Sequence, residues 1–292
     1  MIALVDLLLA PFDYQFMTRA LIATLIASIV CALLSCWLVL VGWSLMGDAV
    51  SHAVLPGVVL AYILGIPFAI GAVVFGILAV GLIGAVRSTG RVKEDAAIGI
   101  VFTTLFALGL VLISITPSQT DLNHIVFGNI LGASTTDIVQ IAILGATVAI
   151  VLIVKRRDFT LYAFDPVHTH AIGLNPRRLG MILLGLLALT AVTALQVVGI
   201  VLVVAMLIIP GATARLLTDR FNTMLLIAPS IAAGSSVIGL YLAYYQDTSP
   251  GGMVVLTQGI AFGLVYLFGP GHGIVTTALR SASERGRTRR VS

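Results

Sequence analysis

Asp48 and His52 are the two residues of this chain whose types and spacing best suit chemistry inside an apolar region. They belong to the block Gly47–Gly57, Gly-Asp-Ala-Val-Ser-His-Ala-Val-Leu-Pro-Gly, and Asp48 is the one ionised side chain between Ala20 and Val86. A carboxylate carried into hydrocarbon costs about 2.5–3.5 kcal/mol on insertion scales. On a helix the i,i+4 spacing sets both side chains on one face, where an oxygen and a nitrogen ligand can converge on one cation. The alternative is that His52 only hydrogen-bonds Asp48 and so makes its burial tolerable.

The composition places this pair in a membrane protein. Of the 292 residues, 59% are hydrophobic and 10% are charged, whereas soluble domains have roughly 25% charged residues. A spanning helix needs about 20 predominantly apolar residues. The predicted fold class is therefore all-α, a polytopic helical membrane protein with about eight or nine apolar segments. The candidates lie near residues 17–41, 44–66, 68–86, 96–115, 137–154, 179–195, 198–214, 221–245 and 253–270.

Proline and glycine are expected to interrupt two of these segments, at Pro56-Gly57 and at Pro210-Gly211. Such segments are broken or re-entrant helices, whose freed backbone groups must be satisfied by protein or water inside the bundle. At Pro210 a gate or hinge and a static kink both remain open. Residues 1–292 are predicted to form a single transmembrane domain without a removable signal peptide. A basic cytoplasmic tail is expected at about 281–292.

Lysines and arginines predict the orientation. They gather at Arg87–Lys93, Lys155–Arg178, Arg215–Arg220 and Arg280–Ser292. The positive-inside rule makes these parts cytoplasmic and leaves residues 116–136 and 246–252 outside. The side of the N-terminus stays open, because an odd number of spans puts it outside and a re-entrant segment puts it inside. A basic tail beside a membrane more often meets anionic lipid or a cytoplasmic partner than nucleic acid, so we expect no nucleic-acid partner.

The connection from Lys155 to Arg178 is expected to contain a short helix. Asp165 can cap it, Pro166 suits its first position and Gly173 can end it. It is a candidate docking element that exposes Phe164 and Ile172; the alternative is a solvated loop. A metal site at His168 and His170 is disfavoured, because an i,i+2 pair does not share a helical face. Cys31 and Cys36 are expected to be small core residues, not a disulfide.

Missing motifs exclude several function classes. The sequence has no Gly-x-x-x-x-Gly-Lys-Ser/Thr phosphate loop, no His-Glu-x-x-His zinc motif and no Gly-x-Ser-x-Gly elbow. Hydrolysis of ATP by this chain, metalloprotease chemistry and serine hydrolysis are therefore disfavoured. Arginine-rich voltage sensors and carbonyl-filter sequences are also missing. An intramembrane enzyme and an ion channel are therefore both disfavoured.

The block Asp48–Gly57 resembles the signature of the membrane permease subunits of bacterial manganese, zinc and iron ABC importers. Further matches support this resemblance over roughly residues 15–270: Glu94–Ile100, Phe127–Leu131, Asp165-Pro166, Gly199–Leu202 and Ile208–Ala214. Asp247–Gly252 lies close to the Asp-x-Pro-Ser-Gly pattern of the family but reads Asp-Thr-Ser-Pro-Gly-Gly.

The resemblance implies a permease subunit of an ATP-driven metal importer in the bacterial inner membrane. Its implied partners are a second permease copy, cytoplasmic ATP-binding subunits and an extracytoplasmic metal-binding protein. Asp48 and His52 would contact the transported manganese, zinc or iron ion, and Asp165-Pro166 would belong to the contact with the ATPase. No permanent cofactor is expected. Asp121 and His124, on the predicted outer side, could assist metal entry or docking of the metal-binding protein; the alternative is an ordinary loop.

Two rival functions remain at this level. A proton-coupled secondary metal transporter would use Asp48 and His52 as a proton relay and would need no ATPase. A non-transporting membrane assembly subunit would use the pair only to fix helix packing, since interhelical polar contacts contribute about 0.6 kcal/mol on average.

Overall fold

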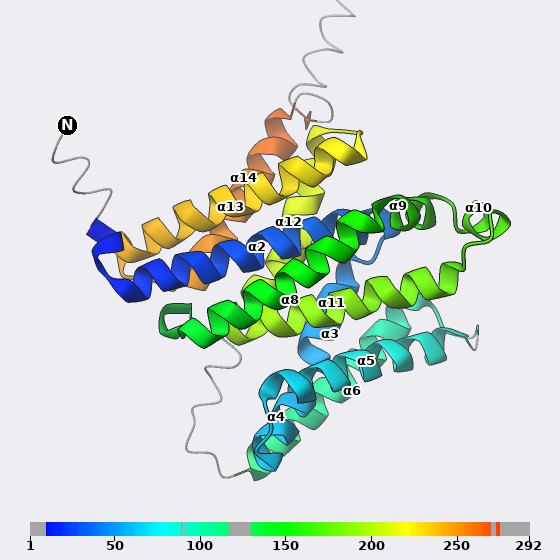
Figure 1. The fold of residues 1–292 in the computed structure, drawn as a ribbon, viewed down its shortest axis with the longest axis horizontal. Coiled ribbons are helices and arrows are strands. Elements are labelled where there is room, and N and C mark those ends of the chain that lie inside the picture. Colours follow the sequence, from blue (N-terminus) through cyan, green and yellow to red (C-terminus); the bar gives the residue numbers. More distant parts are fainter. Residues whose placement is uncertain (1–9, 89, 91, 117–129, 270–272, 275–292) are drawn as a thin grey trace, which may run out of the picture.

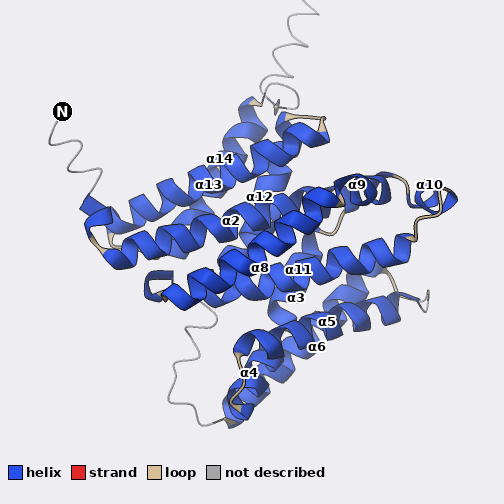
Figure 2. Ribbon diagram, in the orientation of Figure 1, coloured by secondary structure: helices blue, strands red, loops and turns tan. Residues whose placement is uncertain are grey.

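The computed structural model describes residues 10–88, 90, 92–116, 130–269 and 273–274. Within these residues the chain is helical and contains no strand (Figure 2). The elements in chain order are η1 (Ala10–Asp13), α2 (Gln15–Val41), α3 (Ser44–Ala53), α4 (Leu55–Leu64), α5 (Phe68–Ser88), α6 (Glu94–Ile115), η2 (Ile130–Gly132), α8 (Thr135–Val154), α9 (Arg156–Phe164), α10 (Pro166–Ala171), α11 (Pro176–Val198), α12 (Ile200–Leu217), α13 (Phe221–Gln246) and α14 (Pro250–Phe268).

The predicted all-α membrane fold is confirmed. Each of the nine apolar segments corresponds to a long helix or, for residues 44–66, to the pair α3 and α4. Within the described ranges, seven segments are long and apolar enough to cross a membrane, and two shorter apolar helices cover Ile70–Val86 and Leu202–Leu217. The predicted tail at about 281–292 lies outside the described residues.

The helices form two groups with α3 between them (Figure 1). In the larger group, α2 packs against α8, α12 and α13, and α14 packs against α12 and α13. In the smaller group, α4, α5 and α6 pack against one another. The helix α3 contacts α6 on one side and α11 and α12 on the other. A residue on α3 is therefore placed by both groups at once.

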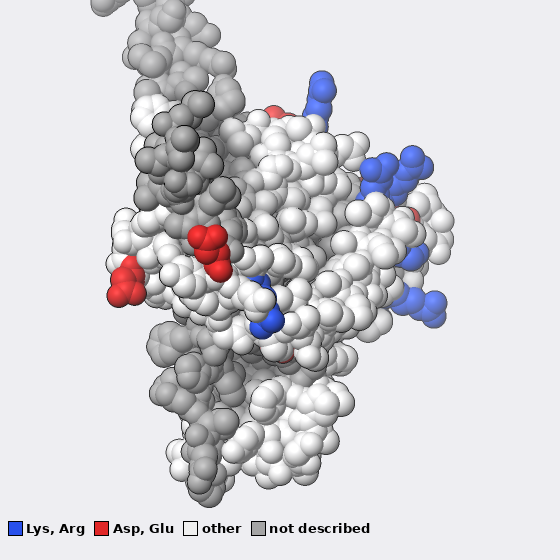
Figure 3. All heavy atoms as spheres, turned by 60° about the vertical axis from the view of Figure 1, so that its left-hand side comes forward, with Lys and Arg blue, Asp and Glu red and all other residues white. Residues whose placement is uncertain are grey.

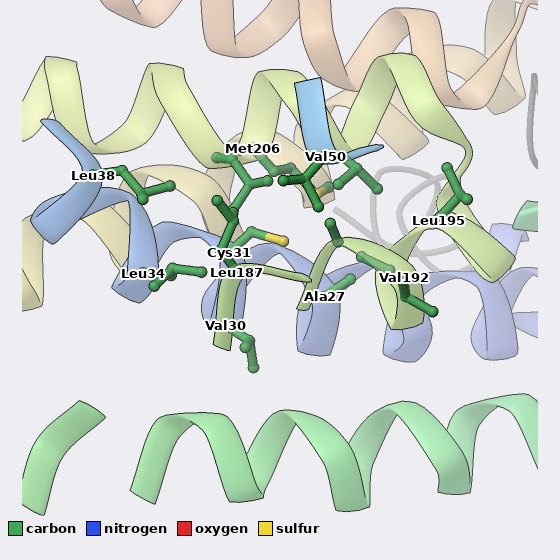
Figure 4. Close-up of a cluster of buried hydrophobic side chains, with 14 of the residues drawn as sticks. Ala27, Val30, Cys31, Leu34, Leu38, Val50, Leu187, Val192, Leu195 and Met206 are labelled. Atoms are coloured by element: carbon green, nitrogen blue, oxygen red, sulfur yellow. The ribbon is translucent and has the colours of Figure 1, made fainter. Parts of the chain in front are cut away.

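The centre of the larger group is a buried apolar cluster (Figure 4). It joins α2, α3, α11 and α12 through fully buried side chains such as Leu34, Val50, Leu187 and Met206. Helix α2 is apolar around its whole circumference, which is typical of a helix surrounded by protein or lipid. Cys31 and Cys36 are both buried and free, as expected.

The segment predicted to break near Pro56 does so. Helix α3 ends at Ala53, and α4 begins at Leu55 with Pro56 in its first turn. Proline has no N–H to donate and disfavours helical geometry at the residue before it, so a helix tends to end just ahead of it. Asp48 and His52 therefore lie on a separate half-helix of ten residues.

The predicted break at Pro210-Gly211 is wrong. Helix α12 continues from Ile200 to Leu217 with Pro210 inside it. A Cβ atom at Gly211 would lie 2.7 Å from the backbone oxygen of Ser35 on α2. Close packing of α12 against α2 thus holds the segment helical despite the proline, because tertiary contacts can offset one lost hydrogen bond.

The connection between α8 and α11 contains two helices where one was expected. The predicted helix is α10: the Asp165 carboxylate accepts the His168 N–H at 2.8 Å, and Gly173 has the positive φ of +87°. The unexpected helix is α9. Its Phe159 is fully buried, with its ring centroid 6.3 Å from that of Trp37 on α2. The local sequence of this connection does not predict a contact with a residue so far away in the chain.

The basic connections lie at one end of the molecule. Figure 1 shows α9, α10 and the connection between α5 and α6 at the right-hand end, opposite the start of α2. Most of the blue Lys and Arg side chains in Figure 3 gather at the same end. If this end is cytoplasmic, α2 begins on the outer side of the membrane. This is the orientation expected when all nine apolar segments cross the membrane.

The contact between α4 and α5 generates a test of the packing. A Cβ atom at Gly71 would collide with the carbonyl oxygen of Gly57 and would lie 2.8 Å from Cβ of Ala61. Gly71→Ala should therefore destabilise the protein by about 1–3 kcal/mol, as overpacking does. Thermal unfolding in detergent would measure this as a lower Tm.

Gly84→Ala is the matched control, because it lies on the same helix with no atom within 4 Å of its Cβ position. Alanine there should leave the stability unchanged or raise it slightly, since alanine favours a helix by about 0.5–1 kcal/mol over glycine. Equal Tm values for the two variants would contradict the proposed close contact.

Candidate metal-contact site

The structure places Asp48 and His52 together on one face of α3. Nδ1 of His52 lies 3.2 Å from Oδ1 of Asp48 and 3.0 Å from its backbone oxygen. The predicted juxtaposition is therefore present. Both partners of Nδ1 are acceptors, so Nδ1 carries the hydrogen that it donates to them.

This arrangement leaves the other ring nitrogen of His52 available. In the neutral ring, a hydrogen on Nδ1 puts the lone pair on Nε2. The described part of the chain gives Nε2 no hydrogen-bond partner. Nε2 is therefore the nitrogen that can bind a cation, while the carboxylate of Asp48 can both orient the ring and neutralise charge.

Two aromatic side chains of α6 hold the imidazole from the side. The ring centroids of Phe102 and Phe106 each lie 5.3 Å from that of His52, at interplanar angles of 71° and 77°. Edge-to-face pairs of this kind are favourable. Nothing in the local sequence singles out these phenylalanines, because they lie in a long apolar stretch of α6 and the contact joins different segments of the chain.

Most of the other residues of α3, from Met46 to Ala53, are buried, and α3 packs against α11 and α12. Val50 and Ser51 are fully buried, and the Ser51 hydroxyl donates to the backbone oxygen of Gly47 at 2.8 Å. A Cβ atom at Gly47 would lie 3.2 Å from Leu207 on α12. These contacts fix the rotation of α3 and so decide which way its polar face points.

The polar face is only partly covered by the chain itself. The side chains of His52 and Asp48 are 24% and 38% exposed. A half-exposed carboxylate on a spanning segment is costly if it faces lipid. Such groups almost always face a bundle interior or a water-filled path.

The two residues are too few to enclose a metal ion. Among the described residues, no three His, Cys, Asp or Glu side chains come together in a geometry that could hold one. His168 and His170 on α10 are both exposed and belong to no such group. Asp121 and His124 lie outside the described residues.

Comparison with known proteins identifies the family. A model described as the ABC 3 transport family matches residues 13–269. The chain is 50% identical over 276 residues to the manganese transport system membrane protein MntB of Synechocystis sp., covering 94% of this chain and 90% of that protein. It is 44% identical over 282 residues to the chelated iron transport system membrane protein YfeC of Yersinia pestis, covering 97% and 96%.

A solved structure agrees in fold. The chain resembles PsaBC from Streptococcus pneumoniae, solved in complex with Fab, with a TM-score of 0.85 and 38% identity. The match covers 93% of this chain and 98% of that one. The chain therefore belongs to the ABC 3 transport family and is a multi-pass membrane permease subunit of an ABC transporter, not an enzyme.

Proposed function

We propose that the chain is the permease of an ATP-driven importer of manganese or iron, and that Asp48 and His52 contact the ion during transport. One observation carries the proposal: a carboxylate and a histidine lie together on the half-exposed face of a half-helix. The family and the printed names of the manganese and iron relatives support the class of cargo. Neither relative's name mentions zinc, which stays a prediction of the sequence.

The ligand chemistry suits a transit site. One carboxylate oxygen and one imidazole nitrogen match the preferences of divalent manganese, iron and zinc, and the carboxylate favours the harder ions. A thiolate would favour soft ions, and both cysteines are buried away from solvent. An ion held by few protein ligands, with water for the rest, can also leave again.

A second copy of the chain would complete the site. The ions named above take four to six ligands, and one chain offers two here. A twofold axis beside α3 would bring a second Asp48 and His52 to the same ion and would cover the half-exposed carboxylate. Isologous contact of this kind is the commonest symmetry of homo-oligomers.

Partner subunits would supply energy and cargo. ATP hydrolysis is assigned to a separate cytoplasmic subunit, and ion delivery to an extracytoplasmic metal-binding protein. The helix α10 at the basic end is the proposed contact for the ATPase, because apolar side chains are exposed on it and at its end: Val167 is 80% exposed, and Ile172, directly after α10, is 53% exposed. Apolar side chains outside the membrane-spanning region are typical of a docking surface.

The two rivals differ from this proposal in what they require. Membership in an ABC transporter family argues against a secondary transporter, because that rival would work without an ATPase. The assembly-subunit alternative gives Asp48 and His52 a purely structural role. A substitution that removes the charge of Asp48 but keeps its shape distinguishes a metal-contact role from a purely structural one.

Asp48→Asn is expected to lower metal uptake into vesicles by at least about tenfold, the range seen when a group supporting a metal ligand is lost. Asparagine keeps an oxygen and nearly the same volume but cannot neutralise a divalent cation. Asp48→Ala and His52→Ala should abolish uptake, with insertion and ATPase assembly intact.

Membrane yield and copurification of the ATPase serve as controls for folding. If the pair were only structural, asparagine could still accept the His52 hydrogen bond, and removal of a partly buried charge would leave uptake near normal. Wild-type uptake by well-inserted Asp48→Asn would therefore rule out the metal-contact role.

Phe102→Leu or Phe106→Leu should lower the apparent affinity for manganese by roughly two- to tenfold, since an aromatic pair contributes about 0.5–1.5 kcal/mol. The reason is that His52 loses an edge-to-face neighbour and presents Nε2 less well. Uptake measured over a range of manganese concentrations would show a raised KM with little change in maximal rate.

Phe262→Leu is the matched control. Phe262 stacks on Tyr266 of the same helix, α14, at 5.9 Å, and has no ring contact with His52. Its loss removes a comparable aromatic pair at another place. An equal rise in KM for this variant would mean that the effect reflects general stability.

Asp165→Ala combined with Pro166→Gly should weaken ATPase binding or uncouple hydrolysis from uptake. The first change removes the acceptor for the His168 N–H and the second frees the first turn of α10, which together loosen the helix. Copurification and ATPase activity with and without metal would measure the effect.

Asn175→Ala combined with Pro176→Gly is the matched control. Asn175 caps α11 by accepting the Arg178 N–H at 3.2 Å, and Pro176 occupies the first turn in the same way. This variant loses an equivalent cap without touching α10. Normal coupling in the Asp165 variant, or equal losses in both, would contradict the assignment.

A further inference from the structure

A groove at the basic end of the molecule is lined by neither Asp48 nor His52. It lies between α9 and the first turn of α13 and has a volume of about 840 Å³. Arg156 and Arg157 line it from α9, and Arg220 lines it from the start of α13. Segments far apart in the sequence thus bring three guanidinium groups to one place.

Among the residues that the structure describes, no carboxylate neutralises the positive charge of the groove. The nearby carboxylates are engaged by other cations: Asp158 pairs with Lys155 at 3.3 Å, and Asp219 pairs with Arg215 at 3.4 Å. Within the described residues no carboxylate forms an ion pair with the three arginines, and none lines the groove. A concave surface with uncompensated positive charge concentrates anions.

The groove also contains the neutral groups that a phosphate ester needs. Thr160 and Asn222 add hydrogen-bonding side chains to its walls, and Leu161 and Phe221 add apolar surface. Guanidinium groups bind phosphate oxygens in a bidentate manner, which makes them well suited to this ligand. The mixture of donors and apolar surface fits a ligand that is itself part anionic and part apolar.

The segments that line the groove adjoin spanning helices that expose apolar side chains. Val154, the last residue of α8, lies two residues before the start of α9 and is 74% exposed. Leu226 lies four residues after Asn222, on the same face of α13, and is 72% exposed. Exposed apolar side chains on spanning helices face lipid chains, so the groove lies at the depth of the head groups.

We propose that this groove binds the phosphodiester head group of an anionic membrane lipid, with its acyl chains along the exposed apolar surface of α8 and α13. Basic pockets between spanning helices on the cytoplasmic side are suited to such lipids. The site is independent of the metal-contact role of Asp48 and His52. It would tie α9, which leads directly into α10, to the membrane surface.

The test uses the purified full-length chain in lipid nanodiscs that contain phosphatidylcholine and phosphatidylglycerol. Native mass spectrometry after release into detergent measures which lipid stays bound. The wild type should retain phosphatidylglycerol in preference to phosphatidylcholine. Arg156→Gln combined with Arg157→Gln should weaken this retention roughly 30-fold, as expected for two arginines at an anionic surface.

Arg177→Gln combined with Arg178→Gln is the matched control, because these arginines are adjacent, exposed and outside the groove. This variant removes the same charge from the same end and should keep the preference for phosphatidylglycerol. Arg220→Gln, from the opposite wall, should give an intermediate loss. All variants should match the wild-type Tm in phosphatidylcholine alone, which keeps folding separate from lipid binding.

Four results would overturn the proposal. The first is no lipid preference in the wild type, and the second is an equal loss in the groove variant and the control. The third is displacement of the retained lipid by inorganic phosphate, which would assign the groove to a free anion. The fourth is loss of ATPase copurification in the Arg156 and Arg157 variant with lipid preference unchanged, which would assign it to an acidic segment of the partner.

Discussion

The contact between the imidazole of His52 and the carboxylate of Asp48 is the interaction on which the proposed function depends. At 3.2 Å it satisfies a carboxylate that hydrocarbon would not tolerate alone, and it fixes the ring so that Nε2 points away from its partner. The same contact leaves the carboxylate half-exposed. A membrane protein cannot leave such a group against lipid, so the pair requires a water path or another protein surface beside it.

The surrounding helices pack so that they hold Asp48 and His52 in place. The half-helix α3 is short because Pro56 ends it, and it is held by α6 on one side and by α11 and α12 on the other. Glycines allow the backbones to approach where the helices must be close, as at Gly57 against Gly71. Packing of small residues is the main source of helix association in a membrane, where apolar burial contributes little.

The basic end of the molecule combines two proposed contacts in one connection. Helix α9 is anchored to the core by Phe159, presents arginines to the groove and continues directly into α10. A lipid held in the groove and an ATPase held by α10 would therefore act on the same connection between α8 and α11. That segment also reaches α2, whose Trp37 contacts both Phe159 and Phe221.

The sequence alone determined the features that depend on composition and on neighbours a few residues apart. The apolar segments, the shared helical face of Asp48 and His52, the break before Pro56 and the capping of α10 by Asp165 all follow from local spacing. The tertiary structure decided what depends on distant segments. Helix α9 is anchored by the contact of Phe159 with Trp37, and Phe102 and Phe106 lie beside His52. Helix α12 stays helical through Pro210, where Gly211 packs closely on Ser35. The tertiary structure also brought Arg220 close to Arg156 and Arg157. The sequence indicated only that these arginines lie on the cytoplasmic side, and helix packing decided that they line one groove.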